Sequence, residues 1–123
     1  YGEATADLIE EGRDVPLAAV ARGRRSRTDL RARRGDLMAA EGVDVWVAPG
    51  APGTAPEGLD STGDPVMNLP WTHAGLPTLA LPAGSVDGLP VGVQCAAAFG
   101  ADERLLSWGE GMASVVADAT PAA

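Results

Sequence analysis

Apolar residues recur at helical spacing near both ends of the chain. Residues 3–11 form a short pattern with Leu8 and Ile9 on one side, and Gly12 follows as a stop. Near the other end, residues 102–116 carry apolar positions that make a broad helical stripe. The two patterns predict a helix near each end of the chain.

A longer helical pattern follows the first one and covers residues 16–41. Asp14 offers an acceptor side chain just before Pro16, and proline is favoured in the first turn of a helix. Gly42 is a favourable residue for the C-terminal stop. Two glycines inside the pattern lower its helix propensity, so it predicts either one kinked helix or two shorter ones.

The middle of the chain alternates between strand-forming runs and segments rich in glycine and proline. Residues 43–48, 77–82 and 91–98 predict three strands, because apolar and β-branched residues dominate them. Residues 84–90 predict a hairpin loop somewhat longer than the shortest types. Residues 49–70 predict a long loop, and a loop of that length in a compact domain is usually functional or disordered.

The predicted order is helix, helix, strand, long loop, two strands and helix. This alternation indicates the α/β class, with a mixed sheet and flanking helices. Neither an internal repeat nor a domain linker is visible, so residues 1–123 are expected to form a single segment.

Composition narrows the class of protein. Of the 123 residues, 46% are hydrophobic, and the apolar runs are far shorter than the ~20 residues that cross a bilayer. The single cysteine, Cys95, excludes an internal disulfide and a cysteine-based metal cluster. The acidic first residues do not resemble a signal peptide. These features predict a cytoplasmic protein with no metal, no other cofactor and no membrane contact.

Charge is distributed unevenly along the chain. The formal net charge is −8, yet all nine basic residues are arginines, and seven of them lie between positions 22 and 34. An arginine run can mark a nucleic-acid surface. This run contains acidic residues at helical spacing and lacks interleaved aromatic residues. We therefore expect a solvated or intramolecularly paired helix face, with no nucleic-acid contact.

Five short sequence motifs follow one another from Val43 onward. In order and spacing they resemble the C-terminal region of the amidase signature family, and the resemblance covers about residues 8–116. It implies the C-terminal part of a mixed-sheet amidase signature fold with flanking helices. The motifs are Asp44-Val-Trp-Val-Ala-Pro49, Asn68-Leu-Pro-Trp-Thr-His-Ala-Gly-Leu-Pro77, Leu81-Pro-Ala-Gly84, Gly88-Leu-Pro-Val-Gly-Val-Gln94 and Asp102-Glu-Arg-Leu-Leu106.

Several residues in these motifs are also expected to have a structural role. Gly84 and Gly88 permit positive φ in the hairpin, and Gly92 allows a neighbouring element to approach the strand closely. Gln94 can satisfy backbone groups at the surface of a sheet.

The resemblance implies hydrolysis of a carboxylic amide to an acid and ammonia or an amine. Members of the family use a serine nucleophile, a second serine with a cis peptide and a lysine base, with backbone donors for the oxyanion. This chain has no lysine, and its serines occur singly. No catalytic residue is therefore assigned. We expect a C-terminal fragment that is inactive alone and whose catalytic residues lie elsewhere in the parent protein.

The resemblance places one wall of the substrate pocket at residues 64–73. Trp71 offers a flat apolar surface, Asn68 and Thr72 offer hydrogen bonds, and His73 completes the predicted substrate-binding set. Many relatives carry asparagine at the position of Thr72. In the alternative interpretation, Trp71 anchors the core and Asn68 caps a turn.

Two residues have further chemistry to consider. His73 is the only histidine, and without a serine or cysteine nearby in sequence it is expected to be a surface or packing residue. Cys95 alternates into an apolar strand face and is expected to be a small buried side chain rather than a nucleophile. The acidic loop between positions 57 and 64 matches no calcium or zinc spacing, and no phosphate-binding loop is present.

Two other functions stay open. The parent protein could be the glutaminase-type subunit of a tRNA-dependent amidotransferase, which shares the family pattern; the acidic balance and Thr72 argue mildly against it. The chain could instead be a binding module without catalysis. In the favoured interpretation, the partner is a small-molecule amide bound by the parent, and a homo-oligomer is compatible with it.

Overall fold

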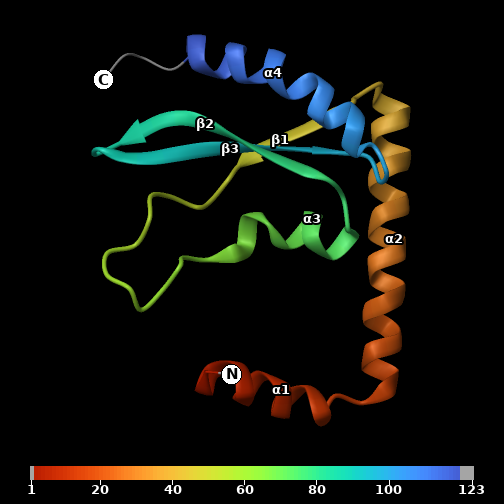
Figure 1. Ribbon diagram of the computed structural model, residues 1–123. Coiled ribbons are helices and arrows are strands. Elements are labelled where there is room, and N and C mark those ends of the chain that lie inside the picture. Colours follow the sequence, from red (N-terminus) through yellow and green to blue (C-terminus); the bar gives the residue numbers. More distant parts are fainter. Residues whose placement is uncertain (1, 120–123) are drawn as a thin grey trace.

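The computed structural model describes residues 2–119, which form a three-stranded sheet with helices on both faces (Figure 1). The chain begins with α1 (Glu3–Arg13) and α2 (Leu17–Glu41), followed by β1 (Val45–Pro49). A loop then leads to a 3₁₀ turn, η1 (Pro65–Met67), and a short helix, α3 (Leu69–Ala74). The hairpin of β2 (Thr78–Val86) and β3 (Leu89–Ala97) precedes α4 (Asp102–Ala119).

α2 is one continuous helix of 25 residues, and its internal glycines do not divide it. Pro16 is its N-cap, whereas Asp14 is the C-cap residue of α1, with φ −86° and ψ −2°. The prediction that Asp14 starts the long helix is therefore wrong, because its backbone still continues the preceding helix. The stop predicted at Gly12 is also wrong, since α1 continues to Arg13. Gly42 ends α2 with φ 63°, as predicted.

The sheet has the order β1-β3-β2, and both pairings are antiparallel. The α/β class predicted from the sequence holds, but the three described strands contain no parallel pair of the kind that a mixed sheet would include. One row across the sheet joins Val47, Cys95 and Leu79. Because successive side chains of a strand point to opposite faces, the neighbouring row with Trp46 and Ala96 faces the other way.

The β2–β3 hairpin turns over two residues, Asp87 and Gly88, whose φ angles are 50° and 78°. The longer loop predicted for residues 84–90 is therefore wrong. The two-residue turn that matches strand twist needs positive φ at both positions, and Asp-Gly is a favoured pair there. Both strands run further toward the turn than predicted, past a register shift between Pro82 and Ser85.

Each face of the sheet carries one buried cluster. Figure 1 shows α3 on one side of the sheet and α4 on the other, with α2 along one end. We call these sides the α3 face and the α4 face. The cluster on the α3 face consists of Trp71, Ala74, Leu76 and Ala96, and that on the α4 face consists of Leu81, Cys95, Ala97 and Leu105.

Candidate functional site

The segment predicted to form a pocket wall is largely helical. Asp64 accepts a hydrogen bond from the Val66 N–H at 2.9 Å, and this contact starts η1. Pro70 lies in the first turn of α3, where its missing N–H costs little, and Gly75 ends the helix with φ 66°. The loop predicted for residues 49–70 is therefore wrong from Pro65 onward. The sequence does carry a signal for this helix, namely proline in its first turn and glycine just past its end, and the prediction of a loop overlooked it.

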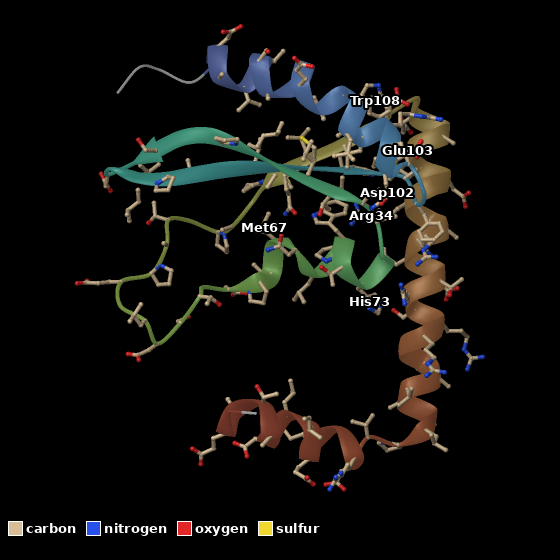
Figure 2. All side chains as sticks on the ribbon, in the orientation of Figure 1. Arg34, Met67, His73, Asp102, Glu103 and Trp108 are labelled. Carbon is tan, nitrogen blue, oxygen red and sulfur yellow. The ribbon has the colours of Figure 1, made fainter. Side chains whose placement is uncertain are left out.

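Trp71 belongs to the core of the α3 face and is only 7% exposed. The guanidinium carbon of Arg34 lies 5.0 Å from the centre of the Trp71 ring and 5.2 Å from that of Trp46. Figure 2 shows Arg34 reaching from α2 into the space between α3 and the sheet. A cation placed over indole rings stabilises by about 0.5–2 kcal/mol. The Trp71 ring, which was expected to face substrate, is thus buried and covered by Arg34. This placement agrees with the alternative interpretation, in which Trp71 anchors the core.

The other half-buried arginine of α2 also contacts an aromatic ring. The Arg31 guanidinium carbon lies 3.6 Å from the centre of the Phe99 ring, and its Nε donates to the Ala74 carbonyl at 2.8 Å. Within residues 2–119, the one salt bridge joins Arg13 and Glu10. Pairing of the arginine run with acidic side chains is therefore not what fixes α2. Its two inward-facing arginines bind rings and a carbonyl, while the other five are exposed.

Thr72 and His73 lie on the exposed side of α3. His73 Nε2 is 3.1 Å from the Oγ of Ser26, which comes from α2. Figure 2 shows His73 near the end of α3, next to α2. The contact ties the end of α3 to α2, which fits the surface or packing role expected for this histidine.

Asn68 joins η1 to α3 and is exposed. It lies at the edge of a hollow of about 500 Å³ formed with the long loop between β1 and η1. The polar side chains that line this hollow are Thr54, Thr62, Asp64 and Asn68, and its other walls are glycine, alanine and proline. The hollow can accept a small polar molecule by hydrogen bonding to hydroxyl, amide and carboxylate groups.

Gln94 fixes one side of this region and is only 4% exposed. Its Nε2 donates to the carbonyl oxygens of Pro49, at 3.0 Å, and Met67, at 2.8 Å. The end of β1 and the end of η1 are therefore held at the same point of β3. The prediction that Gln94 satisfies backbone groups is confirmed.

A glycine of β3 permits the close approach that the sequence predicts for it. The Gly50 N–H donates to the Gly92 carbonyl at 2.8 Å, and a Cβ on Gly92 would lie 3.0 Å from the Leu81 carbonyl oxygen. β2 therefore approaches β3 so closely at this point that a Cβ at position 92 would press on the Leu81 carbonyl oxygen.

The four predicted substrate-binding residues thus occupy three different surroundings. Asn68 faces the loop hollow, Trp71 is buried in the core, and Thr72 and His73 are exposed along α3. They share one short helix and its cap, but they do not converge on one cavity.

An apolar pocket that the sequence did not reveal lies on the α4 face, with a volume of about 680 Å³. Across one row of the sheet, Cys95 is 2% exposed, whereas Val47 is 65% exposed. α4 therefore covers β2 and β3 but leaves β1 open. The pocket is lined by Asp44, Val45, Val47, Val93, Cys95, Ser107, Trp108, Gly111, Met112, Val115 and Val116.

Cys95 lies at the base of this pocket. Burial raises the pKa of its thiol above the ordinary value of 9.0, because desolvation disfavours the thiolate. The thiol is therefore protonated near neutral pH and a poor nucleophile, as expected for a small buried side chain.

The described residues offer no grouping for a metal ion: within residues 2–119, no three His, Cys, Asp or Glu side chains are arranged to hold one. Over the same range, no helix has both the length and the apolar character needed to cross a bilayer.

The Amidase family model matches residues 3–106 of the chain. The glutamyl-tRNA(Gln) amidotransferase A subunit of Pseudomonas fluorescens (strain SBW25) is 44% identical over 82 aligned positions, and the match covers 60% of this chain and 17% of that protein. The corresponding mitochondrial protein of Mycosarcoma maydis is 43% identical over 82 residues, covering 57% of this chain and 15% of the relative. The chain therefore spans less than a fifth of these curated relatives.

Solved structures show the same likeness. A chain from a vestigial complex linked to the evolutionary origins of an s-triazine catabolic enzyme superposes with a TM-score of 0.72 at 28% identity; the match covers 94% of this chain and 28% of that one. A crystal structure of an amidase gives a TM-score of 0.66 at 28% identity, with coverage of 94% and 29%.

Proposed function

This chain belongs to the amidase family, and we propose that it forms part of an enzyme that hydrolyses a carboxylic amide to an acid and ammonia or an amine. The observation that carries the proposal is the match of the family model to residues 3–106, nearly the whole of the described chain. Two solved structures that superpose on 94% of the chain support it.

The chemical step is proposed to use two serines and a lysine that lie outside these residues. The chain contains no lysine, so it cannot supply the base. The thiol of Cys95 is buried and protonated, and the contact between Ser26 and His73 is exposed on the outside of two helices. Neither group offers a shielded, activated nucleophile. We therefore expect the 123-residue chain alone to be inactive.

The contribution of this chain is proposed to be one wall of the substrate pocket. Asn68 lies at the edge of the loop hollow, where its amide group can bind both the carbonyl and the N–H of an amide. Trp71 supports that wall from the core, and Gln94 holds the loop ends in place. Thr72 and His73 belong to the proposed wall through α3, which carries them beside Asn68.

The remainder of the amidase domain is proposed to cover the α4 face. Within residues 2–119, β1 pairs with β3 alone, so its other edge is free. The apolar pocket beside that edge is open, with Val47 at 65% and Val115 at 68% exposure. An apolar helix and a strand from the remaining domain would bury both features.

The test compares the purified chain with the complete protein that contains it, using ammonia release from a panel of small amides. We expect turnover from the complete protein only. Asn68→Ala should lower kcat/KM about tenfold, the usual effect of losing a hydrogen bond to substrate. Leu59→Ala is the matched control, because Leu59 is fully exposed in the same loop region at 102%.

Two outcomes would count against the proposal. Turnover by the pure chain, lost on substitution of one of its own residues, would refute its inactivity. A complete protein that folds but releases ammonia from no amide would remove the proposed activity.

A second candidate is the glutaminase-type subunit of an amidotransferase. Two curated relatives, 44% and 43% identical over 82 residues, are named as the A subunits of glutamyl-tRNA(Gln) amidotransferases. Under this candidate, glutamine is the amide, and turnover by the complete protein depends on partner subunits. Under the first candidate, water is the acceptor and turnover needs no partner. Ammonia release from glutamine, measured with and without partner subunits, separates the two.

We propose that the protein containing this chain works in the cytoplasm. The single cysteine leaves no internal disulfide that would require an oxidising environment.

A further inference from the structure

An arginine side chain of α2 holds the last residue of α3. Figure 1 shows the C-terminal end of α3 beside α2, and there the Arg31 Nε donates to the Ala74 carbonyl at 2.8 Å. The backbone turn at Gly75 binds the Thr72 carbonyl, which lies further back in the helix. Arg31 thus supplies a donor to the kind of terminal carbonyl that finds no partner within its own helix.

An aromatic ring keeps the Arg31 side chain in this place. The guanidinium carbon lies 3.6 Å from the centre of the Phe99 ring, which follows β3 in the connection to α4. A planar guanidinium can stack on a ring and donate a hydrogen bond in its own plane, which the compact ammonium of lysine cannot do. One side chain therefore links α2, the end of α3 and the segment after β3.

Gly75 makes room for this contact. A Cβ on Gly75 would lie 2.9 Å from Nη2 of Arg27 and 2.9 Å from Nη2 of Arg31. Gly42, at the end of α2, has nearly the same left-handed backbone, with φ 63° against 66°, but a Cβ there would meet nothing within 4 Å. The absence of a side chain at position 75 thus serves the approach of α2 as well as the backbone turn.

The opposite end of this short helix begins at Asn68. The Thr72 N–H donates to the Asn68 carbonyl at 3.0 Å, which ties Asn68 to the first turn of α3. Just before it, Gln94 binds the Met67 carbonyl at 2.8 Å. α3 has six residues, about 9 Å in length, and is too short to be stable without such contacts. A shift at the Arg31 end is therefore expected to move Asn68 as well.

We propose that Arg31 is a positioning residue for the wall of the substrate pocket. It fixes the C-terminal end of α3 and thereby sets the place of Asn68 at the loop hollow. The inference rests on the proposed function, in which Asn68 binds the substrate amide. Misplacement of a binding group by about 1 Å can lower activity about 100-fold, even when the change lies far from the chemistry. Any effect of Arg31 on turnover should then pass through Asn68.

The test is a double-mutant cycle in the complete protein that contains this chain, measured as kcat/KM for amide hydrolysis. Arg31→Lys keeps the charge but loses the planar group, and should lower kcat/KM about five- to tenfold. Combined with Asn68→Ala, it should cost no more than Asn68→Ala alone, because the group that it positions is already gone. Arg33→Lys changes an exposed arginine of the same helix and is the control, with kcat/KM unchanged.

The two glycines separate position from stability. Gly75→Ala and Gly42→Ala both place a side chain where φ is positive, so both should lower the melting temperature. Only Gly75→Ala pushes guanidinium groups away from the end of α3. It should lower kcat/KM as Arg31→Lys does, whereas Gly42→Ala should leave kcat/KM unchanged. Circular dichroism checks that every variant is folded at the assay temperature.

Two results would overturn the inference while the proposed function stands. One is wild-type kcat/KM in Arg31→Lys when Asn68→Ala lowers it. The other is a double variant whose loss is the product of the two single losses, because Arg31 would then act independently of Asn68.

A complete protein without amide turnover, or one that Asn68→Ala leaves fully active, would instead remove the proposed role of the wall. Hydrogen exchange on the same samples then decides whether Arg31 fixes α3. Faster exchange at residues 65–75 in Arg31→Lys, but not in Arg33→Lys, would support it. Equal exchange in the two variants would overturn it.

Discussion

The two faces of the sheet bury clusters of equal size but are closed in different ways. On the α3 face, polar groups reach into the apolar packing: Arg34 lies over two indole rings, and Gln94 binds two carbonyl oxygens. On the α4 face, the packing is apolar, and a pocket of about 680 Å³ stays open beside β1. The α3 face is thus fixed by directional contacts within the chain. The α4 face has the character of a surface that an apolar element would complete.

The first prediction tests whether the α3 face contributes more to stability. Trp71→Ala should lower the free energy of unfolding by about 3–5 kcal/mol, because it removes a buried aromatic ring and leaves a cavity. Trp108→Ala is the matched change on the α4 face, where the indole is half-buried and lines the open pocket. It should cost about 1–2 kcal/mol, since less area leaves water on folding. Urea unfolding followed by circular dichroism measures both, and equal losses would contradict the difference between the faces.

The second prediction concerns the directional contacts themselves. Gln94→Leu keeps the volume of the side chain but removes both hydrogen bonds, so the carbonyls of Pro49 and Met67 lose their donor. We expect a loss of about 2–3 kcal/mol in unfolding free energy. Hydrogen exchange of the amides in η1 and α3 should become faster, whereas exchange in α4 should not. Thr72→Val, an exposed polar-to-apolar change on α3, is the control and should alter neither quantity.

Much of the fold follows from local sequence patterns. Alternating apolar residues around Cys95 and Trp46 mark strands with two different faces, and the stripe that includes Leu105 marks α4. Gly42 ends α2 because it can adopt a left-handed backbone. These signals act over a few residues, which is why they can be read along the chain.

The rest depends on contacts between distant residues. α3 has only six residues, too few for a helical period, and it is held by the burial of Trp71 and Ala74. No local signal tells whether Val47 is covered, because that depends on how far α4 extends across the sheet. Asn68 and His73 are close in sequence and were predicted to share one site. In the fold Asn68 lies at the loop hollow, whereas His73 contacts Ser26 of α2. The family resemblance supplied the fold, but not these contacts.

The third prediction compares two glycines of α4. A Cβ on Gly109 would lie 2.7 Å from the Cδ2 of Leu79, whereas a Cβ on Gly111 would meet nothing within 4 Å. Gly111→Ala should therefore stabilise the helix by up to about 1 kcal/mol through its higher helix propensity. Gly109→Ala gains the same propensity but must displace Leu79, so it should be about 1–2 kcal/mol less stable than Gly111→Ala. Thermal unfolding of the two variants measures the difference, and equal melting temperatures would mean that α4 packs on β2 more loosely than described.

The smallest expected effect is the pH dependence contributed by Cys95. Its pKa is raised by burial, so the unfolded thiol loses its proton first as the pH rises past 9.0. The unfolded state then binds fewer protons than the folded state, and stability falls with increasing pH. The contribution is complete below pH 9.0 and is lost as the pH rises through the folded pKa. Cys95→Ala removes this titration. Between about pH 8 and 10 the wild type should therefore lose more unfolding free energy than the variant, and parallel curves would contradict the raised pKa. Because Cys95 lies at the base of the open pocket, an apolar element bound there would desolvate the thiol further and move the loss to higher pH.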